Sequence, residues 1–388
     1  MAGRQDRYHV LIAGGGVAAL EAMVALRTLA EDRVDIELLA PDRDFFYRPL
    51  AVAEPFGTGK ALRFDLRALA TGCGTRHRLG SLAAISAPKH RATTGHGESV
   101  FYDALLLAMG AREFIAVPGA LTYRGNHDSP AFSRILAETL RGEVKTLAFV
   151  VPSRVTWPLP LYELALQTAT RLEDEGIEAR IVLLTPEETP LIVFGREGSE
   201  AVAGLLADKA IELLCGVHVE KFHKGLVHLV PGVPVPAERV IALPGLRGIP
   251  LSGVPADNSS FVHVDALGRI KGLEDVYAAG DGTSFPVKQG GLAAQMADAA
   301  ASAIAEAAGA SVEPAPFDPV LRGLLLTGAE PEYLRAELGG GRMYASTAAD
   351  SPLWWPAGKI AARYLSPYLA EHADLAFGAF GQRSGAGA

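Results

Sequence analysis

The sequence has few cysteines, no excess of positive charge and no long apolar run. Cys73 and Cys215 are the only cysteines among 388 residues, and neither belongs to a C-x-x-C or similar motif. We therefore expect two unpaired thiols in hydrophobic surroundings, not a redox pair. The net charge of −8 argues against a nucleic-acid partner, which needs a basic face to replace phosphate counterions. No stretch approaches the roughly 18 uninterrupted apolar residues of a membrane-spanning helix.

What is present is typical of a soluble globular enzyme. Hydrophobic residues make up 49% and charged residues 21% of the chain, and glycine and proline are spread along it. The length allows two or three domains with a well-buried core. The first apolar run, Val10 to Ala13, is too short for a secretory signal and leads directly into glycines. We therefore expect a cytoplasmic protein.

Two strand–helix–strand patterns predict an α/β fold with parallel sheets. The first runs from Tyr8 to Leu39 and the second from Thr146 to Leu184, so they form a coarse internal repeat. A third apolar strand, Val276 to Ala279, leads into an alanine-rich helix from Gly291 to about Ala308. Each strand is followed by a helix, as a parallel sheet requires.

Smaller elements are predicted between these patterns. Alternating segments from Leu82 to Ala108 predict a small antiparallel meander that ends in an apolar strand. A helix is predicted to begin with Ser129 as its N-cap residue and Pro130 in its first turn.

The turn after the first strand, GGGVAA at residues 14–19, fits the G-x-G-x-x-G/A pattern that binds a dinucleotide. Gly14 allows the tight turn, and Gly16 lets the backbone approach a pyrophosphate. Val17 and Ala18 open the helix, whose free N–H groups and positive dipole end face the phosphates. The alternative is a glycine turn with only a structural role.

One residue of this pattern is missing. The carboxylate that grips the ribose should end the second strand. Ala40 stands at that place, and Asp42 follows two residues later. Either Asp42 substitutes for the carboxylate, or backbone groups and water around Ala40 hold the ribose.

Two further stretches resemble flavoprotein signatures. YDALLLAMGA, from Tyr102 to Ala111, resembles the YDxLxxATGA segment of flavoproteins with two dinucleotide domains, with Met109 where threonine is usual. VYAAGD, from Val276 to Asp281, resembles their second FAD signature, in which the aspartate accepts a hydrogen bond from a ribityl hydroxyl. With the glycine turn, in this order, they resemble the FAD-dependent pyridine nucleotide-disulfide oxidoreductase superfamily over about residues 8 to 310. The resemblance implies two Rossmann-like, glutathione-reductase-type three-layer domains and a bound FAD.

FFYRPL (residues 45–50) and FPVKQGG (residues 285–291) look most like the sulfide:quinone oxidoreductase and type II NADH dehydrogenase branch. This resemblance implies that Arg48 and Pro49 approach the flavin and that Lys288 lies at its pyrimidine end. A lysine and a helix N-terminus there would stabilise the negative charge of reduced flavin. The alternative for Lys288 is a solvated surface lysine. The residues predicted to bind the cofactor are Gly14, Gly16, Val17, Ala18, Ala40, Asp42, Arg48, Pro49, Leu82, Ala108, Met109, Gly110, Gly280, Asp281, Lys288, Gln289 and Gly290.

The second strand–helix junction, FVVPSRVTWPLPLYELAL from Phe149 to Leu166, stands at the place of a second dinucleotide loop but has no glycine. Pro158 and Pro160 remove two N–H donors from the anion-binding end of the helix. Trp157 and Arg154 place bulk where glycine would let a pyrophosphate approach. We therefore expect no conventional NAD(P)H binding here, although Arg154 could still pair with a phosphate.

Glu163 and Lys288 are the predicted catalytic residues. In the related dehydrogenases a glutamate follows the second glycine loop on the helix that faces the flavin, and YELAL resembles that segment. The resemblance implies that Glu163 relays protons to an acceptor such as a quinone. An ordinary first-turn glutamate, favoured by the helix dipole, is an equally supported alternative.

Thiol, serine and metal chemistry are not supported. The stretch RPLAVAEPFGTG has no cysteine where disulfide reductases of the superfamily carry C-x-x-x-x-C, and no G-x-S-x-G elbow occurs. His218, His223 and His228 recur every five residues, which puts neighbours on opposite faces of a strand. We expect surface or hairpin histidines and no metal site.

Aromatic residues are concentrated near the C-terminus. In membrane-associated relatives the C-terminal segment docks to the bilayer and opens a quinone channel, and Trp354, Trp355, Tyr364 and Tyr368 would serve similarly at the inner membrane face. The alternative, a tail packed over the first domain or in a homodimer interface, is favoured because basic residues are sparse. The last residues, GQRSGAGA, are predicted to be disordered.

We therefore predict an FAD-binding domain of residues 1–112 and 245–312, a second Rossmann-like domain of residues 113–244, and a C-terminal segment of residues 313–388. The predicted function is two-electron transfer through non-covalent FAD from a small donor to a quinone or other acceptor, without a redox disulfide. The alternatives are an NAD(P)H:acceptor oxidoreductase and a flavin-binding protein without turnover, whose second domain serves interaction or regulation.

Overall fold

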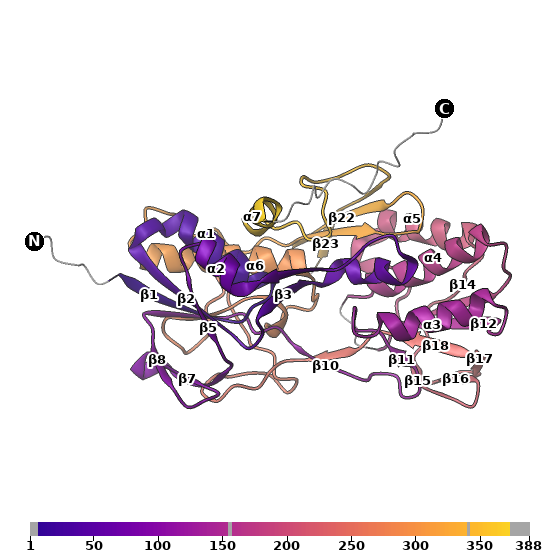
Figure 1. Cartoon of the computed structure of the whole chain (residues 1–388), viewed down its shortest axis with the longest axis horizontal. Coiled ribbons are helices and arrows are strands. Elements are labelled where there is room, and N and C mark those ends of the chain that lie inside the picture. The colour runs from indigo at the N-terminus through magenta and orange to yellow at the C-terminus, as the bar shows by residue number, and fades with distance from the viewer. Residues whose placement is uncertain (1–6, 154–156, 340–341, 373–388) are drawn as a thin grey trace, which may run out of the picture.

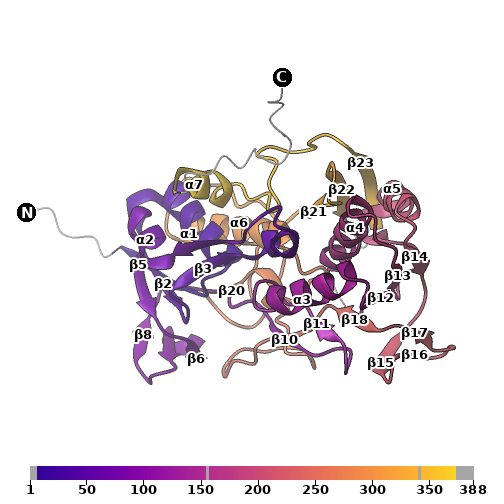
Figure 2. The same ribbon diagram turned by 45° about the vertical axis from the view of Figure 1, so that its right-hand side comes forward.

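The computed structural model describes residues 7–153, 157–339 and 342–372. Two α/β domains lie side by side along the longest axis, and the C-terminal segment lies across both of them (Figure 1). A view turned by 45° shows the C-terminal segment again lying above both domains (Figure 2). The predicted α/β fold with two Rossmann-like domains is confirmed.

The first domain is built on a five-stranded parallel sheet in the order β20-β9-β1-β2-β5. Helices α1 (Val17–Ala30) and α6 (Gly290–Ala307) cover one face, and a small antiparallel sheet, β6-β7-β8, covers the other. Within β1, Val10 and Ile12 join the helix side, and Leu11 and Ala13 join the other side, so every central position is apolar. The strands are β1 (Tyr8–Ala13), β2 (Val34–Ala40), β5 (Arg76–Leu79), β6 (Leu82–Ser86), β7 (Arg91–Thr94), β8 (Ser99–Phe101), β9 (Ala104–Leu107) and β20 (Val276–Ala278).

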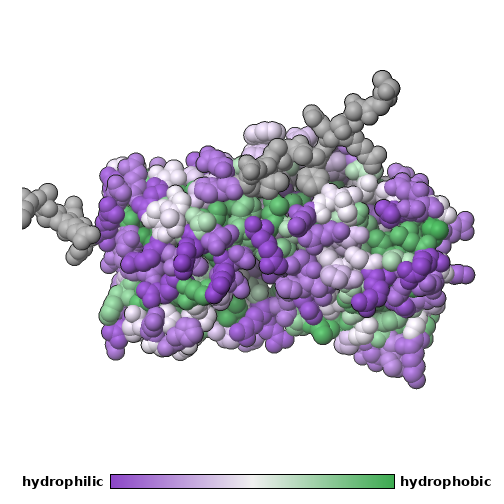
Figure 3. Space-filling view, in the orientation of Figure 1, coloured by the Kyte–Doolittle hydropathy of each residue, from purple (hydrophilic) through white to green (hydrophobic). Residues whose placement is uncertain are grey.

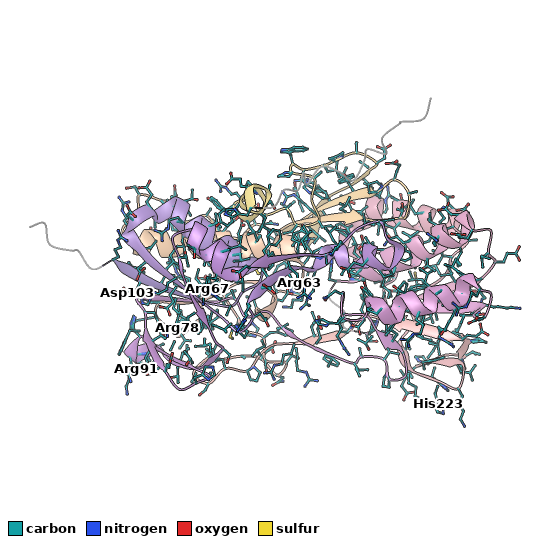
Figure 4. The ribbon with its side chains drawn as sticks, viewed as in Figure 1. Arg63, Arg67, Arg78, Arg91, Asp103 and His223 are labelled. Atoms are coloured by element: carbon teal, nitrogen blue, oxygen red, sulfur yellow. The ribbon has the colours of Figure 1, made fainter. Side chains whose placement is uncertain are left out.

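The predicted meander differs from the structure in its last strand. β6, β7 and β8 form the antiparallel sheet, but β9 leaves it and lies between β1 and β20 in the parallel sheet. The chain changes sheets at Asp103, labelled in Figure 4, whose carboxylate accepts a hydrogen bond from the His9 N–H at 2.7 Å. Because all four residues of β9 are buried, the strand needs a sheet that is covered on both faces.

The second domain repeats this plan with a parallel sheet in the order β11-β18-β12-β13-β14. Its elements are α3 (Ser129–Leu140), α4 (Leu159–Asp174), α5 (Gly195–Asp208), β11 (Leu121–Thr122), β12 (Thr146–Val150), β13 (Arg180–Leu184), β14 (Glu212–Leu214) and β18 (Arg239–Ala242). An antiparallel sheet of β15 (Val219–His223), β16 (Leu226–Leu229) and β17 (Val235–Pro236) covers the face of the parallel sheet opposite α4. An antiparallel pair, β10 (Arg112–Phe114) and β19 (Gly245–Arg247), connects the two domains.

The predicted start of α3 was wrong by one residue. Asp128 is the N-cap residue and Ser129 is the first residue of the helix, with Pro130 following as predicted. The Asp128 carboxylate accepts a hydrogen bond from the Arg124 N–H at 2.9 Å. The Ser129 hydroxyl is used for tertiary structure, because it donates to Glu54 at 3.2 Å.

The C-terminal segment forms a three-stranded antiparallel sheet and a short helix. The strands are β21 (Val320–Leu325), β22 (Glu332–Gly339) and β23 (Arg342–Ala349), and the helix is α7 (Leu365–His372). The sheet packs on α5 and α4 of the second domain, whereas α7 packs on α1 of the first. Two further strands of the first domain, β3 (Asp44–Tyr47) and β4 (Leu62–Asp65), form a hairpin, and α2 (Leu66–Gly72) follows it.

Most of the C-terminal aromatic side chains face the protein. The Trp354 ring packs against Tyr333 at 5.3 Å between centroids, and the Tyr368 hydroxyl donates to the Leu69 carbonyl at 2.6 Å. Tyr364 packs against the core of the first domain, and Trp355 is 84% exposed. In the described part of the chain, no helix combines the length and the apolarity that crossing a membrane requires. The predicted disordered end lies outside the described residues.

The surface view in Figure 3 shows a face that is mostly hydrophilic, with smaller apolar areas scattered between the polar side chains. Such a distribution is ordinary for a protein of this size.

A pair of buried carboxyl groups fastens the C-terminal segment to the first domain. Glu21 of α1 is completely buried and accepts hydrogen bonds from the N–H groups of Tyr364 at 2.9 Å and Leu365 at 2.5 Å. Asp298 of α6 lies beside it. Burial, and then the negative charge of Glu21, raise the pKa of Asp298 to about 9, while Arg363 opposes the shift. The pair therefore holds a proton at neutral pH.

Replacing Asp298 by asparagine is expected to make the protein less sensitive to alkaline pH. The Asp298 carboxyl keeps its proton in the folded state up to about pH 9, whereas an unfolded aspartate loses it near a pKa of about 4. Its contribution to stability is therefore full below about pH 4 and is lost as the pH rises towards 9. Melting temperatures of wild type and Asp298→Asn between pH 5 and 9 should diverge, with the variant more stable at pH 8. Asp208→Asn, at an exposed position, is the control, and parallel curves for wild type and Asp298→Asn would contradict the assignment.

Candidate functional site: a cavity between the two domains

A cavity of about 850 Å³ lies between the two domains. The first domain contributes the turn after β1, the segment after β2, the end of β9 and the segment from β20 to α6. The second domain contributes the start of α4, and the C-terminal segment contributes part of β21 and the residues around Lys359. The cavity therefore combines the ends of strands from both sheets, which is where ligands bind in open α/β sheets.

The first glycine turn forms an open cradle at one end of the cavity. Gly14 has a φ of +138°, and a Cβ there would lie 2.0 Å from the Ala108 carbonyl oxygen, so β1 and β9 approach at this point too closely for any side chain. Gly16 has open space beside it, because a Cβ there would meet no atom within 4 Å. No side chain caps α1, which begins at Val17. The N–H groups at the start of α1 can therefore receive an anion.

The two residues predicted near the ribose, Ala40 and Asp42, differ in their exposure to the cavity. Ala40 is completely buried beneath Gly15 and does not line the cavity, whereas Asp42 is exposed and lines it. The buried carboxylate of β2, Glu37, is engaged elsewhere. Burial raises its pKa, but hydrogen bonds from His9 and Arg78 outweigh this effect and lower it to about 2. Of the two predicted positions, Asp42 is therefore the one that lines the cavity.

The other predicted cofactor residues of the first domain line the same cavity. Arg48 does so with its guanidinium held by Glu113 of β10, at 2.7 Å between nitrogen and oxygen. Gly110 has a φ of +70°, and a Cβ there would meet no atom within 4 Å, so it leaves the same kind of open space as Gly16. The remaining predicted residues on the cavity wall are Val17, Ala18, Pro49, Leu82, Ala108, Met109 and Gly280.

Lys288 is a buried lysine near the half-buried Asp281, which contradicts the alternative of a solvated surface lysine. Its ammonium group donates a hydrogen bond to the Thr283 carbonyl and lies 4.1 Å from the centre of the Phe261 ring. Burial lowers the pKa of Lys288 to about 8, and the negative charge of Asp281 opposes this shift. Burial likewise raises the pKa of Asp281, and the charges of Lys288 and Arg48 oppose that shift.

Gln289 and Gly290 also line the cavity, but the Gln289 side chain has a structural role. Its oxygen accepts a hydrogen bond from the Leu292 N–H at 2.8 Å and so caps α6. Its amide nitrogen donates to the Arg322 carbonyl at 3.1 Å and so joins α6 to β21. Gly290 is needed for space, since a Cβ there would lie 3.1 Å from the Ile360 side chain.

The second strand–helix junction forms a wall of the cavity. Trp157, Leu159 and Pro160 line it, and Pro158 is the N-cap residue of α4. The prediction for Arg154 lies outside the described residues. In the next turn, the Tyr162 hydroxyl donates to Glu187 at 2.7 Å, so the carboxylate that follows β13 is already occupied.

Glu163 forms a buried ion pair with Lys359, a residue that the sequence did not single out. The Lys359 ammonium donates to Glu163 Oε1, which also accepts from the Leu326 N–H at 2.9 Å. Their side chains are 1% and 5% exposed, and both residues line the cavity. Burial raises the pKa of Glu163 and lowers that of Lys359, and the charge of each partner opposes the shift of the other. The only sign of this pair in the sequence was that Lys359 is the single lysine of an apolar, aromatic segment.

The cysteines and the repeated histidines lie away from this cavity. Cys73 and Cys215 are free thiols and do not line it. His223 lies in the β15–β16 hairpin, which Figure 4 places at the opposite end of the molecule from Arg78. Within the described ranges, no group of three or more His, Cys, Asp or Glu residues is arranged to hold a metal ion.

Comparisons with known proteins agree with this architecture. No protein-family model matches the sequence. The chain is 27% identical over 291 residues to a protein of Mycobacterium tuberculosis, from each of two strains, named "NADH dehydrogenase-like protein", and the match covers 70% of this chain and 72% of that protein.

Among solved structures, the sulfide:quinone oxidoreductase of the hyperthermophilic bacterium Aquifex aeolicus is similar with a TM-score of 0.78 at 19% identity, over 88% of this chain and 86% of that chain. The chain has the fold of the FAD-dependent pyridine nucleotide-disulfide oxidoreductases. A ferredoxin reductase of the CYP199A2 system from Rhodopseudomonas palustris shares this flavoprotein fold, with a TM-score of 0.66 at 18% identity, over 86% of this chain and 83% of that chain. The cavity lies between the two Rossmann-like domains of this flavoprotein fold.

Proposed function

We propose that the protein is an FAD-dependent oxidoreductase that passes two electrons from a small donor to a quinone or another acceptor. The observation that carries this proposal is the continuity of one cavity. Its first end, at Gly16, suits a dinucleotide pyrophosphate, and its other end holds the buried Glu163–Lys359 pair. A cofactor that exchanges electrons and groups that exchange protons would thus meet in one cavity.

The residues of the first domain fit a non-covalent FAD. The open space beside Gly16 and the uncapped start of α1 suit the pyrophosphate, and Asp281, on the cavity wall, would accept a hydrogen bond from the ribityl chain. FAD would supply the two-electron chemistry. Lys288, whose pKa of about 8 allows it to be charged at neutral pH, would place a positive charge near the flavin pyrimidine ring.

Glu163 and Lys359 are suited to hold a proton for the acceptor. Because burial moves their pKa values towards each other, Lys359 holds the proton of this pair less firmly against Glu163 than the two groups would in water. An acceptor such as a quinone takes up protons with its electrons, so a buried proton donor beside the flavin cavity would serve its reduction.

We also propose that this reaction uses neither a redox disulfide nor conventional NAD(P)H binding. Neither thiol lines the cavity, and burial raises the pKa of Cys73, which makes its thiolate less available. At the second junction, Trp157 and the prolines around it occupy the place of a glycine loop. The alternative, an NAD(P)H:acceptor oxidoreductase, is favoured by one observation, the name of the Mycobacterium tuberculosis relative.

Anaerobic mixing tests this proposal and its alternative. Purified protein with bound FAD is mixed with NADH, NADPH, sulfide or other small donors, and the flavin absorbance near 450 nm is followed. We expect NADH and NADPH to bleach the flavin no faster than they bleach free FAD. Bleaching within seconds would establish the alternative, and bleaching by sulfide would contradict the argument from the cysteines. If no donor reduces the flavin and no quinone reoxidises it, the protein binds flavin without turnover.

A further inference from the structure

We infer that Arg322 is the anchor for an organic carboxylate, and that the small molecule that exchanges electrons with the flavin carries this group. This inference rests on the proposed function and names the chemical class of its substrate. Arg322 lies in β21, on the wall of the cavity.

Arg322 has no acidic partner among the described residues. Among the other cations on the cavity wall, Lys359 is paired with Glu163 and Arg48 with Glu113 at 2.7 Å, and the negative charge of Asp281 acts on the buried Lys288. Arg322 is half-buried and forms neither an ion pair nor a side-chain hydrogen bond within this part of the chain. A half-buried guanidinium without a counter-charge loses hydration without compensation, so the site gains free energy when an anion enters.

A neighbouring positive charge acts on Arg322. Arg335 of β22 stands directly opposite Arg322 in the antiparallel register, so the two side chains share one face of the sheet. Arg335 is paired with Glu337 at 2.7 Å, which leaves Arg322 as the unpaired member. Burial, and then the charge of Arg335, lower the pKa of Arg322. Like charges opposite each other destabilise a sheet, and a bound anion would remove this cost.

The position of Arg322 places it between the proposed flavin and the proton-carrying pair. Its carbonyl accepts a hydrogen bond from Gln289 at the start of α6, where the flavin pyrimidine ring is expected. Directly after the end of this strand, the Leu326 N–H donates a hydrogen bond to Glu163 at 2.9 Å. An anion held by Arg322 would therefore lie within the reaction space.

The surroundings favour a carboxylate on an apolar body. Leu324 lies two residues along β21, on the same face as Arg322, and it also lines the cavity. The guanidinium presents parallel N–H donors that match a planar carboxylate in a bidentate geometry. A small planar acid would place its carboxylate on the Arg322 guanidinium and its apolar body against the apolar side chain beside it.

Benzoate and benzamide test this inference because they differ in charge but hardly in shape. Each is titrated into the FAD-bound protein, and the perturbation of the flavin absorbance is followed. We expect saturable benzoate binding at least about tenfold tighter than that of benzamide. Arg322→Gln should weaken benzoate binding at least about tenfold and leave benzamide unchanged, and Arg322→Lys should fall between. Arg335→Gln, on the same face but already paired, is the matched control and should change benzoate binding less than about threefold.

Two results would overturn the inference. One is equal binding of benzoate and benzamide by the wild type, which decides the matter even if Arg322→Gln does not fold. The other is a lower flavin reduction potential or lower FAD content in Arg322→Gln and Arg322→Lys without any ligand, because Arg322 would then serve the flavin itself. If the wild-type protein binds no FAD, the proposed function fails, whereas FAD binding without discrimination between the two probes refutes the carboxylate anchor alone.

Discussion

Alanine at Gly14 is expected to prevent folding of the first domain, whereas alanine at Gly16 is expected to leave the fold intact and to abolish FAD binding. At Gly14 a Cβ would lie 2.0 Å from the Ala108 carbonyl oxygen, in a backbone with φ +138°. The Ala108 backbone cannot move away without separating β1 from β9. The free energy of unfolding should therefore fall by more than about 4 kcal/mol. At Gly16 the new methyl group would meet no protein atom within 4 Å and would project into the space proposed for the pyrophosphate.

The two substitutions are measured by thermal unfolding of the FAD-free protein and by FAD titration. Gly16→Ala should melt within about 1 °C of the wild type and bind FAD at least about 100-fold more weakly. Gly204→Ala is the control, because a Cβ there also meets no atom within 4 Å but lies within helix α5. It should be neutral or slightly stabilising. Unchanged FAD affinity in Gly16→Ala would refute the assignment of the glycine turn.

Replacing Lys359 by methionine is expected to be among the most destabilising changes on the cavity wall. The substitution keeps the length of the side chain but leaves the Glu163 carboxylate buried without its counter-charge. Removing one member of a buried pair costs about 3 to 5 kcal/mol. The pKa of Glu163, which burial already raises, should rise further because the opposing charge of Lys359 is gone. The variant should therefore be most destabilised at high pH. There Glu163 is ionised in the unfolded chain, whereas in the folded protein it must either ionise in a buried site or stay protonated.

A double-mutant cycle with Glu163→Gln separates the pair from its surroundings. The glutamine keeps an oxygen for the Leu326 N–H, so the double variant removes both charges and leaves the hydrogen bond possible. We expect it to be more stable than Lys359→Met alone, measured by thermal unfolding at several pH values. Glu175→Gln breaks the exposed pair with Arg171 as the matched control, and should cost about 0.5 kcal/mol or less. Additive effects of the two buried substitutions would contradict the coupling.

The local pattern of the chain was enough to predict the first domain and its glycine turn. Short-range signals suffice there, because a buried strand, a tight turn and a helix form one continuous stretch from Tyr8 to Ala30. The unusual second junction was also visible locally, since prolines and a tryptophan stand where a nucleotide loop needs glycine. The path of β9 was not predictable in the same way, because an apolar strand fits either sheet until its neighbours are known.

The sequence by itself therefore determined the α/β class, the resemblance to flavoproteins and the absence of a cysteine motif. Only the tertiary structure decided that Glu163 pairs with Lys359, that Gln289 caps α6, and that Arg322 lines the cavity with no acidic partner in the described part of the chain. The physical reason is separation along the chain. Glu163 and Lys359 are 196 positions apart, and no local periodicity reports a contact at that distance. A charge is recognised as unpaired only when every neighbouring element has been placed.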